Sequence, residues 1–144
     1  MPCANWRSEI GEVSAPVWLE TAAVARMHMD QLAEHGGGLG LRDAGLLDSA
    51  MAPAKNLHAY GETDLIVLAT AYASGIVRNH PFIDGNKRTG FLAAYVFLAV
   101  NGFEIVADEP DVVVTMLALA AGELSDEAFT GWLRAVVTPM AAGP

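Results

Sequence analysis

Hydrophobic positions recur at helical spacing along most of the chain, and turn-forming residues separate the segments. Two segments are apolar around most of the helical cylinder, from Thr63 to Asn79 and from Lys87 to Asn101. A helix that is apolar all round belongs in the interior of a domain, because no face of it suits water. The pattern therefore predicts a central pair of helices, joined by the short segment between them.

Further helices are predicted on either side of this pair, over 21–34, 43–51, 111–121 and 126–137. Gly36-Gly37-Gly38 ends the first and Pro53 the second, since glycine adopts left-handed backbone conformations and proline lacks the N–H donor of a helix. The alternation of polar and apolar residues from Ala54 to Gly61 favours a turn or a small β-hairpin. The predicted fold class is all-α, with about six helices around a central antiparallel pair and possible room for a hairpin flap.

The length of 144 residues fits a single domain over 1–144, with one hydrophobic core. We expect loosely held ends, a lead-in over 1–15 and a tail over 138–144, because chain termini are often poorly ordered. A short extended piece is predicted at 17–19, before the first helix. The chain is therefore expected to form its helical bundle between about residues 15 and 138.

Neither of the two longest uncharged apolar runs, 65–77 and 89–103, reaches the roughly 20 residues of a membrane span. Arg7, Glu9 and Glu12 interrupt the start of the chain, where a secretory signal needs an unbroken apolar run. We therefore expect a cytoplasmic protein that does not contact membranes.

The formal net charge of -9 argues against binding to a nucleic-acid backbone, which depends on clustered cations. DNA binding through the helix that starts at Lys87 fits this charge poorly. However, three of the eight basic residues fall within eleven positions, namely Arg78, Lys87 and Arg88. These cations could form a local site for a small anionic ligand on an acidic protein. Cys3 is the single cysteine, so it cannot form an internal disulfide and is interpreted as an incidental thiol.

The segment between the two central helices is HPFIDGNKRTG, residues 80–90. The first N–H groups of a helix have no partner within it and attract anions. Gly85 allows close approach of a ligand to the backbone, and Asn86 is a suitable N-cap. Lys87 and Arg88 place two positive charges beside this anion seat, and arginine can hold a phosphate through two parallel hydrogen bonds.

Asp84 and His80 supply further chemistry in the same segment. A single carboxylate beside a phosphate is a suitable Mg²⁺ ligand, because this ion also takes phosphate oxygens and water. An imidazole can accept a proton at cellular pH, so His80 is the candidate general base. Phe82 is expected to point into the core and hold the loop. These groups suit phosphoryl transfer, but each also has an ordinary structural explanation, and the residues alone leave the two interpretations equally open.

His80 to Arg88 resembles the signature of the Fic/Doc superfamily, His-x-Phe-x-Asp/Glu-Gly-Asn-Gly-Arg-x-x-Arg, in the Asn-Lys-Arg form of the death-on-curing (Doc) toxins. GLRDAGLLDSA from Gly40 to Ala50, the turn from Asn56 to Gly61 and the apolar helix before the motif are also similar to Doc-type chains. The resemblance covers about residues 17–121. It implies a Fic-like helical bundle that binds ATP and Mg²⁺ at the motif.

Two positions depart from the Fic signature. Lys87 stands where Fic enzymes have glycine, and Phe91 stands where they have the second arginine, which binds nucleotide phosphates during AMP transfer. The resemblance to the Doc branch therefore implies transfer of the γ-phosphate of ATP to a hydroxyl of a protein, a translation elongation factor. Adenylyl transfer to a protein remains an alternative, as does a catalytically idle module that binds a nucleotide or a partner protein.

Position by position, the resemblance assigns a role to each residue of the motif. His80 would be the base and Asp84 the Mg²⁺ ligand. Gly85 and Asn86 would form the anion seat, and Lys87 with Arg88 the phosphate clamp, so the catalytic set is His80, Asp84 and Arg88.

The superfamily's inhibitory helix has the form Ser/Thr-x-x-x-Glu-Gly/Asn, and this chain has only a near match, Ser8 to Glu12 followed by Val13. The resemblance therefore implies restraint by a separately encoded antitoxin protein, with an internal brake as the lesser hypothesis. Other candidates receive simpler interpretations. Arg78 serves the phosphate site or the helix dipole; the other histidines, His28, His35 and His58, are structural or exposed; and the resemblance places Asn56 and Tyr60 near the target protein.

Overall fold

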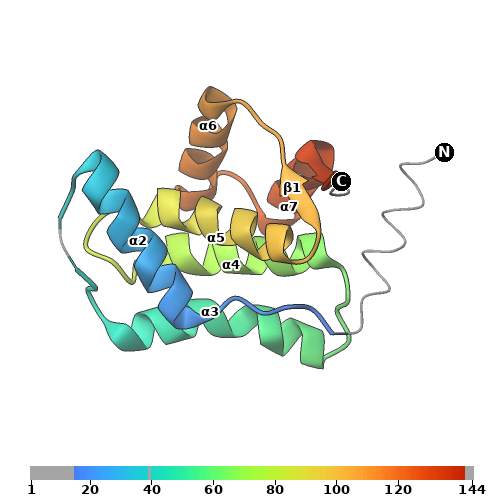
Figure 1. Cartoon of the computed structure of the whole chain (residues 1–144), viewed down its shortest axis with the longest axis horizontal. Coiled ribbons are helices and arrows are strands. Elements are labelled where there is room, and N and C mark those ends of the chain that lie inside the picture. Colours follow the sequence, from blue (N-terminus) through green and yellow to red (C-terminus); the bar gives the residue numbers. More distant parts are fainter. Residues whose placement is uncertain (1–14, 39, 142–144) are drawn as a thin grey trace.

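The helices of this chain stack around a central pair, α4 and α5, in a computed structural model that describes residues 15–38 and 40–141 (Figure 1). The elements in chain order are α2 (Thr21–His35), α3 (Ala44–Ala59), α4 (Leu65–Asn79), α5 (Asn86–Val100), β1 (Phe103–Ile105), α6 (Glu109–Ala120), α7 (Asp126–Val136) and β2 (Val137–Pro139). The all-α prediction with about six helices is confirmed. The predictions for Cys3 and for a brake at Ser8 to Glu12 lie outside the described residues.

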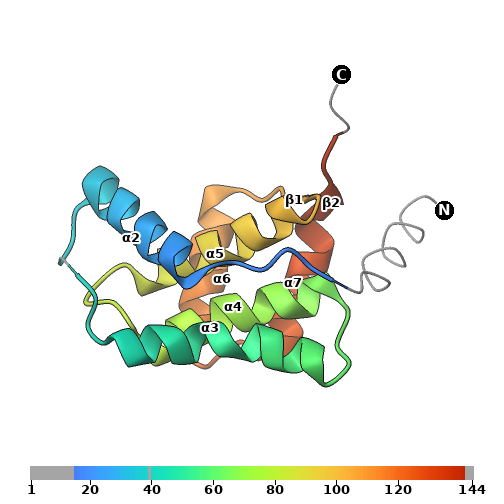
Figure 2. The same cartoon turned by 60° about the horizontal axis from the view of Figure 1, so that its bottom comes forward.

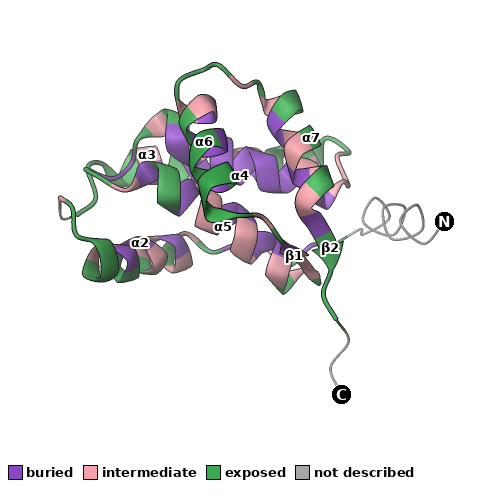
Figure 3. Cartoon of the chain, turned by 90° about the horizontal axis from the view of Figure 1, so that it is seen from above, coloured by how far each residue is buried: buried purple, intermediate pink, exposed green. Residues whose placement is uncertain are grey.

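α4 forms the centre of the core. Eleven of its fifteen residues are buried, and Figure 3 shows the helix largely in the colour of buried residues. α5 lies antiparallel beside it, with the Phe97 ring 5.0 Å from the Tyr72 ring between centroids, and Gly90 against Val77. Full burial of a large apolar side chain contributes about 1.5–3 kcal/mol, so this pair supplies much of the stability that fixes the loop between its helices.

α7 packs on α4 through a row of polar contacts. The hydroxyl groups of Thr70 and Thr130 lie 2.7 Å apart, and the Ser74 hydroxyl donates to the Asp126 carboxylate at 2.9 Å. The Arg78 guanidinium also lies 2.9 Å from that carboxylate. From the sequence, Arg78 was predicted to serve the phosphate site or the helix dipole. In the structure it is a residue of the α4–α7 interface.

α3 continues through Pro53, so the predicted stop at this residue is wrong. The turn or hairpin predicted for Ala54 to Gly61 is wrong for residues 54–59, which are helical, while Tyr60 and Gly61 form a turn. Proline removes one helical donor, the one that would bond the carbonyl of Ser49, and Ser49 is an exposed residue where water can take over that role. Ala54, the next residue, is fully buried. Packing against α4 therefore outweighs the local preference to end the helix.

A small two-stranded sheet, which the sequence did not predict, joins the segment after α5 to the segment after α7. β1 and β2 pair antiparallel, with Phe103 opposite Pro139 and Ile105 opposite Val137. The loose tail predicted from residue 138 is therefore wrong for Thr138 and Pro139, which lie in β2. Strands of three residues are too short to show an alternating pattern, so only their pairing reveals them.

The segment before α2 is fixed to the far end of α5 without forming a strand. The Val17 N–H donates to Asn101 Oδ1 at 2.8 Å, and Asn101 Nδ2 donates to the Val17 carbonyl at 2.9 Å. The Leu19 N–H donates to the Tyr72 hydroxyl at 3.4 Å. Figure 2 shows residues 15–20 passing along the bundle to the start of α2.

Across the described ranges, none of the helices combines the length and apolar character that crossing a membrane requires.

Candidate active site

The loop between α4 and α5 begins with a left-handed residue. His80 has φ 48° and ψ 55°, the single positive φ at a non-glycine position within 15–38 and 40–141. A left-handed backbone costs an L-residue roughly 1–2 kcal/mol, so neighbouring groups must hold it. Arg42 does so, because its Nε donates to the His80 carbonyl at 2.7 Å and its guanidinium also donates to the Asn79 carbonyl at 3.1 Å. The turn leaves His80 exposed, where the imidazole can meet a substrate.

The segment before α3 pairs with the same loop. Leu41 and Phe82 form an isolated antiparallel bridge, and the Arg42 N–H donates to the Pro81 carbonyl at 2.7 Å. These backbone bonds join positions about forty residues apart in the chain. The loop therefore has a strand-like partner along one side, although it belongs to no sheet.

Phe82 and Asn86 fasten the loop from inside. Phe82 is 2% exposed, and its ring stacks on His28 with 3.8 Å between centroids, which confirms the prediction that it points into the core. Asn86 Oδ1 accepts from the Phe82 N–H at 3.1 Å, and Asn86 Nδ2 donates to the Phe82 carbonyl at 3.0 Å. The prediction of Asn86 as N-cap is wrong, since Gly85 holds that position with φ 80° and Asn86 is the first helical residue. The Asn86 side chain shapes the seat, which leaves its backbone N–H for an anion.

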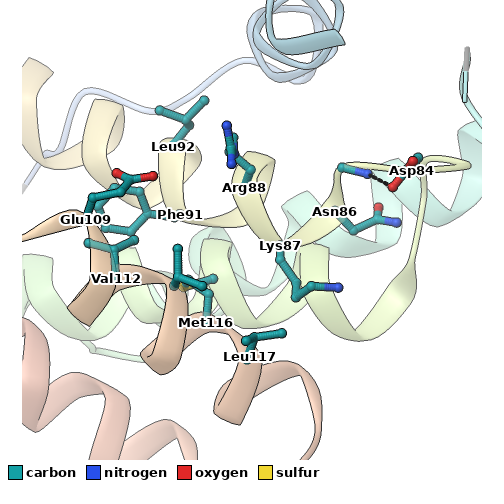
Figure 4. A pocket seen from close by; sticks show the side chains of 12 residues that line it. Asp84, Asn86, Lys87, Arg88, Phe91, Leu92, Glu109, Val112, Met116 and Leu117 are labelled. Atoms are coloured by element: carbon teal, nitrogen blue, oxygen red, sulfur yellow. Dashed lines mark hydrogen bonds between the residues drawn. The ribbon is translucent and has the colours of Figure 1, made fainter. Parts of the chain in front are cut away.

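Asp84 lies at the tip of the loop with an exposed carboxylate (Figure 4). Its Oδ1 accepts from the Gly85 N–H at 2.8 Å and its Oδ2 from the Gly38 N–H at 3.4 Å. The Asp84 carbonyl accepts from Nε2 of the buried His28 at 2.7 Å. These bonds orient the carboxylate and leave lone pairs free for a cation.

The single carboxylate of Asp84 fits an Mg²⁺ ion that takes most of its ligands from phosphate and water rather than from protein side chains. Among the residues that the structure describes, no cluster of three or more His, Cys, Asp or Glu side chains could hold a metal ion. Mg²⁺ commonly takes one or two carboxylates and completes its shell with phosphate oxygens and water. A single carboxylate beside an anion seat suits that ion when it arrives with a phosphate ligand.

The start of α5 carries the predicted positive charge. The Thr89 N–H donates to the Gly85 carbonyl at 3.0 Å, so the N–H groups of residues 86–88 precede the first helical bond and point toward the loop. The positive end of the helix dipole adds to their effect. Lys87 and Arg88 are both exposed, and Figure 4 shows them leaving α5 in different directions. The two cations flank the seat and do not converge on one point.

A pocket of about 360 Å³ extends from the loop into the space between α5 and α6. Figure 4 shows Phe91 and Glu109 at the end of the pocket that lies away from Asp84. Phe91 is partly buried, with its ring centroid 6.5 Å from that of Trp132. The pocket is therefore polar and charged near the loop, largely apolar along its middle, and lined by Asp84, Gly85, Asn86, Lys87, Arg88, Phe91, Leu92, Glu109, Val112, Val113, Met116 and Leu117.

Comparison with known proteins identifies the fold and the loop together. The model of the Fic/DOC family matches residues 18–98, which include α2 to α4, the loop and most of α5. The chain belongs to the Fic/DOC family. This match lies within the range of 17–121 expected from the resemblance.

Two relatives place this Fic/DOC chain in the death-on-curing branch. It is 43% identical over 77 residues to "Toxin Doc" of Mycolicibacterium smegmatis, an alignment that covers 51% of this chain and 58% of that protein. It is 31% identical over 109 residues to "Protein kinase doc" of Escherichia phage P1, which covers 75% of this chain and 86% of the phage protein. The Fic/DOC chain thus spans less than two thirds of the first relative and most of the second.

Two residues that the resemblance suggested for target contact lie away from the Fic/DOC loop. Asn56 lies within α3, not in a turn, and Tyr60 follows that helix with 93% of its side chain exposed. Tyr60 precedes the N-terminal end of α4, whereas His80 follows its C-terminal end, and a helix of fifteen residues spans roughly 20 Å. The structure does not bring Asn56 or Tyr60 to the candidate site.

Sequence reasoning did not predict the contacts by which two residues hold the Fic/DOC loop. Arg42 lies in the GLRDAGLLDSA stretch, but nothing in its spacing points to carbonyl groups 37 and 38 residues further on. His28 was interpreted as structural or exposed, and the structural interpretation is confirmed, since the residue is buried and bonded to the loop. A histidine on the inner face of an amphipathic helix is the one local signal that could have marked it.

Proposed function

We propose that this chain is a Doc-type toxin of a toxin-antitoxin pair and acts as a protein kinase. It would transfer the γ-phosphate of ATP to a hydroxyl of a protein, and a translation elongation factor in the cytoplasm is the proposed target. The observation that carries this proposal is the loop between α4 and α5, which holds the exposed His80 close in sequence to Asp84 and to a cationic helix start. The names of the two relatives, a toxin and a protein kinase, support it.

Each step uses a group of the described loop. The His80 imidazole would take the proton of the attacking hydroxyl. The hydroxyl oxygen forms a bond to the γ-phosphorus while the bond from that phosphorus to the β–γ bridging oxygen breaks, and ADP leaves. The N–H groups at the start of α5, with Lys87 and Arg88, would hold the phosphate oxygens as charge moves toward ADP. Asp84 would hold Mg²⁺, which when bound neutralises phosphate charge.

The wall of the pocket favours phosphate transfer over AMP transfer. Phe91 stands where the Fic signature has its second arginine, and the structure places its ring in the lining between α5 and α6. An apolar ring cannot hold the additional phosphates that this arginine binds in AMP transfer. Adenylyl transfer therefore remains the less supported enzyme hypothesis.

Two forms of labelled ATP distinguish these functions. The purified chain would be added to a bacterial lysate with ATP labelled at the α- or the γ-phosphate, beside a His80→Asn variant. Asparagine tolerates left-handed backbone, so this variant removes the base with little change to the turn. We expect γ label alone to enter a protein band, and only with the native chain. Label from the α position would show AMP transfer, and no label from either would favour an idle binding module.

Restraint by a separate antitoxin predicts a phenotype for the chain alone. Expression in a bacterial culture without any partner should arrest growth, because no other protein would cover the active loop. The His80→Asn variant, expressed to the same level, should allow growth to continue. Arrest by both proteins would show that toxicity does not require the proposed base.

A further inference from the structure

Gln31 of α2 is buried, yet none of the residues that the structure describes accepts a hydrogen bond from its amide. The residue is 6% exposed, and its Nε2 is a buried side-chain atom without a hydrogen-bond acceptor. A buried donor that lacks an acceptor costs free energy in the folded protein, so such a group usually has a reason to be kept. An apolar side chain of the same length would avoid that cost.

The Gln31 carboxamide lies against the tip of the loop between α4 and α5. A Cβ placed on Gly85, the N-cap of α5, would lie 3.1 Å from Gln31 Oε1. His28 precedes Gln31 by three residues, which puts both on one face of α2, and it donates to the Asp84 carbonyl at 2.7 Å. α2 thus presents two polar side chains to the loop, one already bonded and one with a free donor.

A half-turn of the carboxamide would bring its donor to the anion seat. The oxygen and nitrogen of a glutamine amide exchange places by rotation about the terminal torsion, which has a broad and roughly two-fold preference. Nε2 would then occupy the position beside Gly85, where the unbonded N–H groups of residues 86–88 begin. An anion at the start of α5 would meet a donor from α2 as well as the backbone donors of α5.

We propose that Gln31 is an anion-binding residue of this site and donates to a phosphate oxygen held at the start of α5. The inference rests on the proposed function only for the source of that phosphate, which is ATP in the kinase reaction. In this proposal α2 contributes to ligand affinity as well as to the hydrophobic core. Binding of pyrophosphate tests the residue without any transfer reaction.

The decisive variant is Gln31→Met, which keeps the length of the side chain and removes its amide. We expect the dissociation constant for pyrophosphate, measured by titration calorimetry in Mg²⁺, to rise by about five- to tenfold, as for the loss of one hydrogen bond. The thermal midpoint should stay the same or rise, because a buried unpaired donor is removed. The matched control is Met29→Gln, the reverse exchange at an exposed position of α2, which should change neither quantity.

A direct signal comes from the side-chain amide resonances of Gln31, identified by their absence in Gln31→Met. Addition of pyrophosphate should shift them in the native chain. A second variant, Gln31→Glu, has nearly the same shape and should weaken binding further because its carboxylate repels the anion.

An unchanged pyrophosphate affinity in folded Gln31→Met would overturn the proposal. A loss of affinity accompanied by a lower thermal midpoint would also overturn it, because Gln31 would then only support the loop. A chain that binds pyrophosphate through Gln31 but transfers no γ label would contradict the kinase proposal and leave this one standing.

Discussion

At His80 the backbone takes a left-handed conformation while the side chain faces solvent. Such a combination persists only where other groups compensate its cost, and Arg42 is the residue that binds the carbonyl groups on both sides of the turn. The candidate base therefore depends on a cation from another segment for its position. Arg42 does not need to touch substrate to affect the rate.

Replacement of Arg42 by glutamine tests this support. Loss of two hydrogen bonds to carbonyl groups should lower the free energy of unfolding by about 1–3 kcal/mol, measured by urea denaturation. The matched control is Arg26→Gln, because Arg26 makes an exposed pair with Asp30 on α2 and should contribute less than about 0.5 kcal/mol. Equal effects of the two substitutions would contradict the role assigned to Arg42.

Among the elements, α3 and α4 cross at a distance that only glycine permits. A Cβ at Gly75 would lie 2.4 Å from the backbone carbonyl oxygen of Ala50, a group that cannot rotate away. Gly131 in α7 offers the opposite case, since within 15–38 and 40–141 no atom lies within 4 Å of the Cβ that would be added there. Replacement of glycine by alanine should therefore have opposite effects on the free energy of unfolding in α4 and in α7, two helices that pack against each other.

Gly75→Ala should lower the free energy of unfolding by roughly 1–3 kcal/mol or more, because overpacking outweighs the gain in helix propensity. Gly131→Ala should raise it by about 0.5–1 kcal/mol, since alanine restricts the unfolded chain and favours the helix. Urea denaturation of both variants measures the two effects. A stabilising Gly75→Ala would show that α3 and α4 lie further apart than described.

The elements also show what the sequence could determine. α4 and α5 begin and end within two residues of the predicted bounds, because both are long, strongly apolar and bordered by Asn, Asp or Gly. The extension of α3 past Pro53 could not be predicted, since the burial of Ala54 against α4 is a tertiary contact. β1 and β2 depend on a pairing between positions more than thirty residues apart.

The candidate site likewise has a part that the sequence predicts and a part that it does not. Its chemical groups from His80 to Arg88 are contiguous, so a motif can name them. The groups that position this motif come from α2 and from the segment before α3, and a contact such as His28 with Asp84 leaves no periodic signal in either stretch.

At the scale of the whole molecule, one core joins all the described helices, and Tyr72 lies within it at 1% exposure. Burial raises the pKa of the Tyr72 phenol above its ordinary value of 10.0, with a smaller contribution from the charge of Glu20, while the hydrogen bond from Leu19 acts in the opposite direction. The folded state therefore keeps the phenol neutral to a higher pH than the unfolded state does. The stability from this group is complete below the unfolded pKa and is lost as pH rises toward the folded value.

Alkaline denaturation tests the buried phenol. Urea midpoints measured between about pH 8 and about pH 11 should fall more steeply for the native chain than for Tyr72→Phe, because phenylalanine has no proton to release. Tyr60 and Tyr95 are present in both proteins and serve as an internal control. Parallel pH profiles would contradict the assignment of the pKa shift to Tyr72.

The contacts that hold the loop between α4 and α5 restrict its motion before any ligand binds. The Phe82 N–H is bonded to Asn86, the Phe82 ring lies on His28, and the neighbouring Pro81 carbonyl is held by Arg42. The conformational entropy of ordering this loop is therefore lost when the chain folds and not when a ligand arrives. In hydrogen exchange, the Phe82 amide should exchange at the rate of global unfolding, as if it belonged to the core.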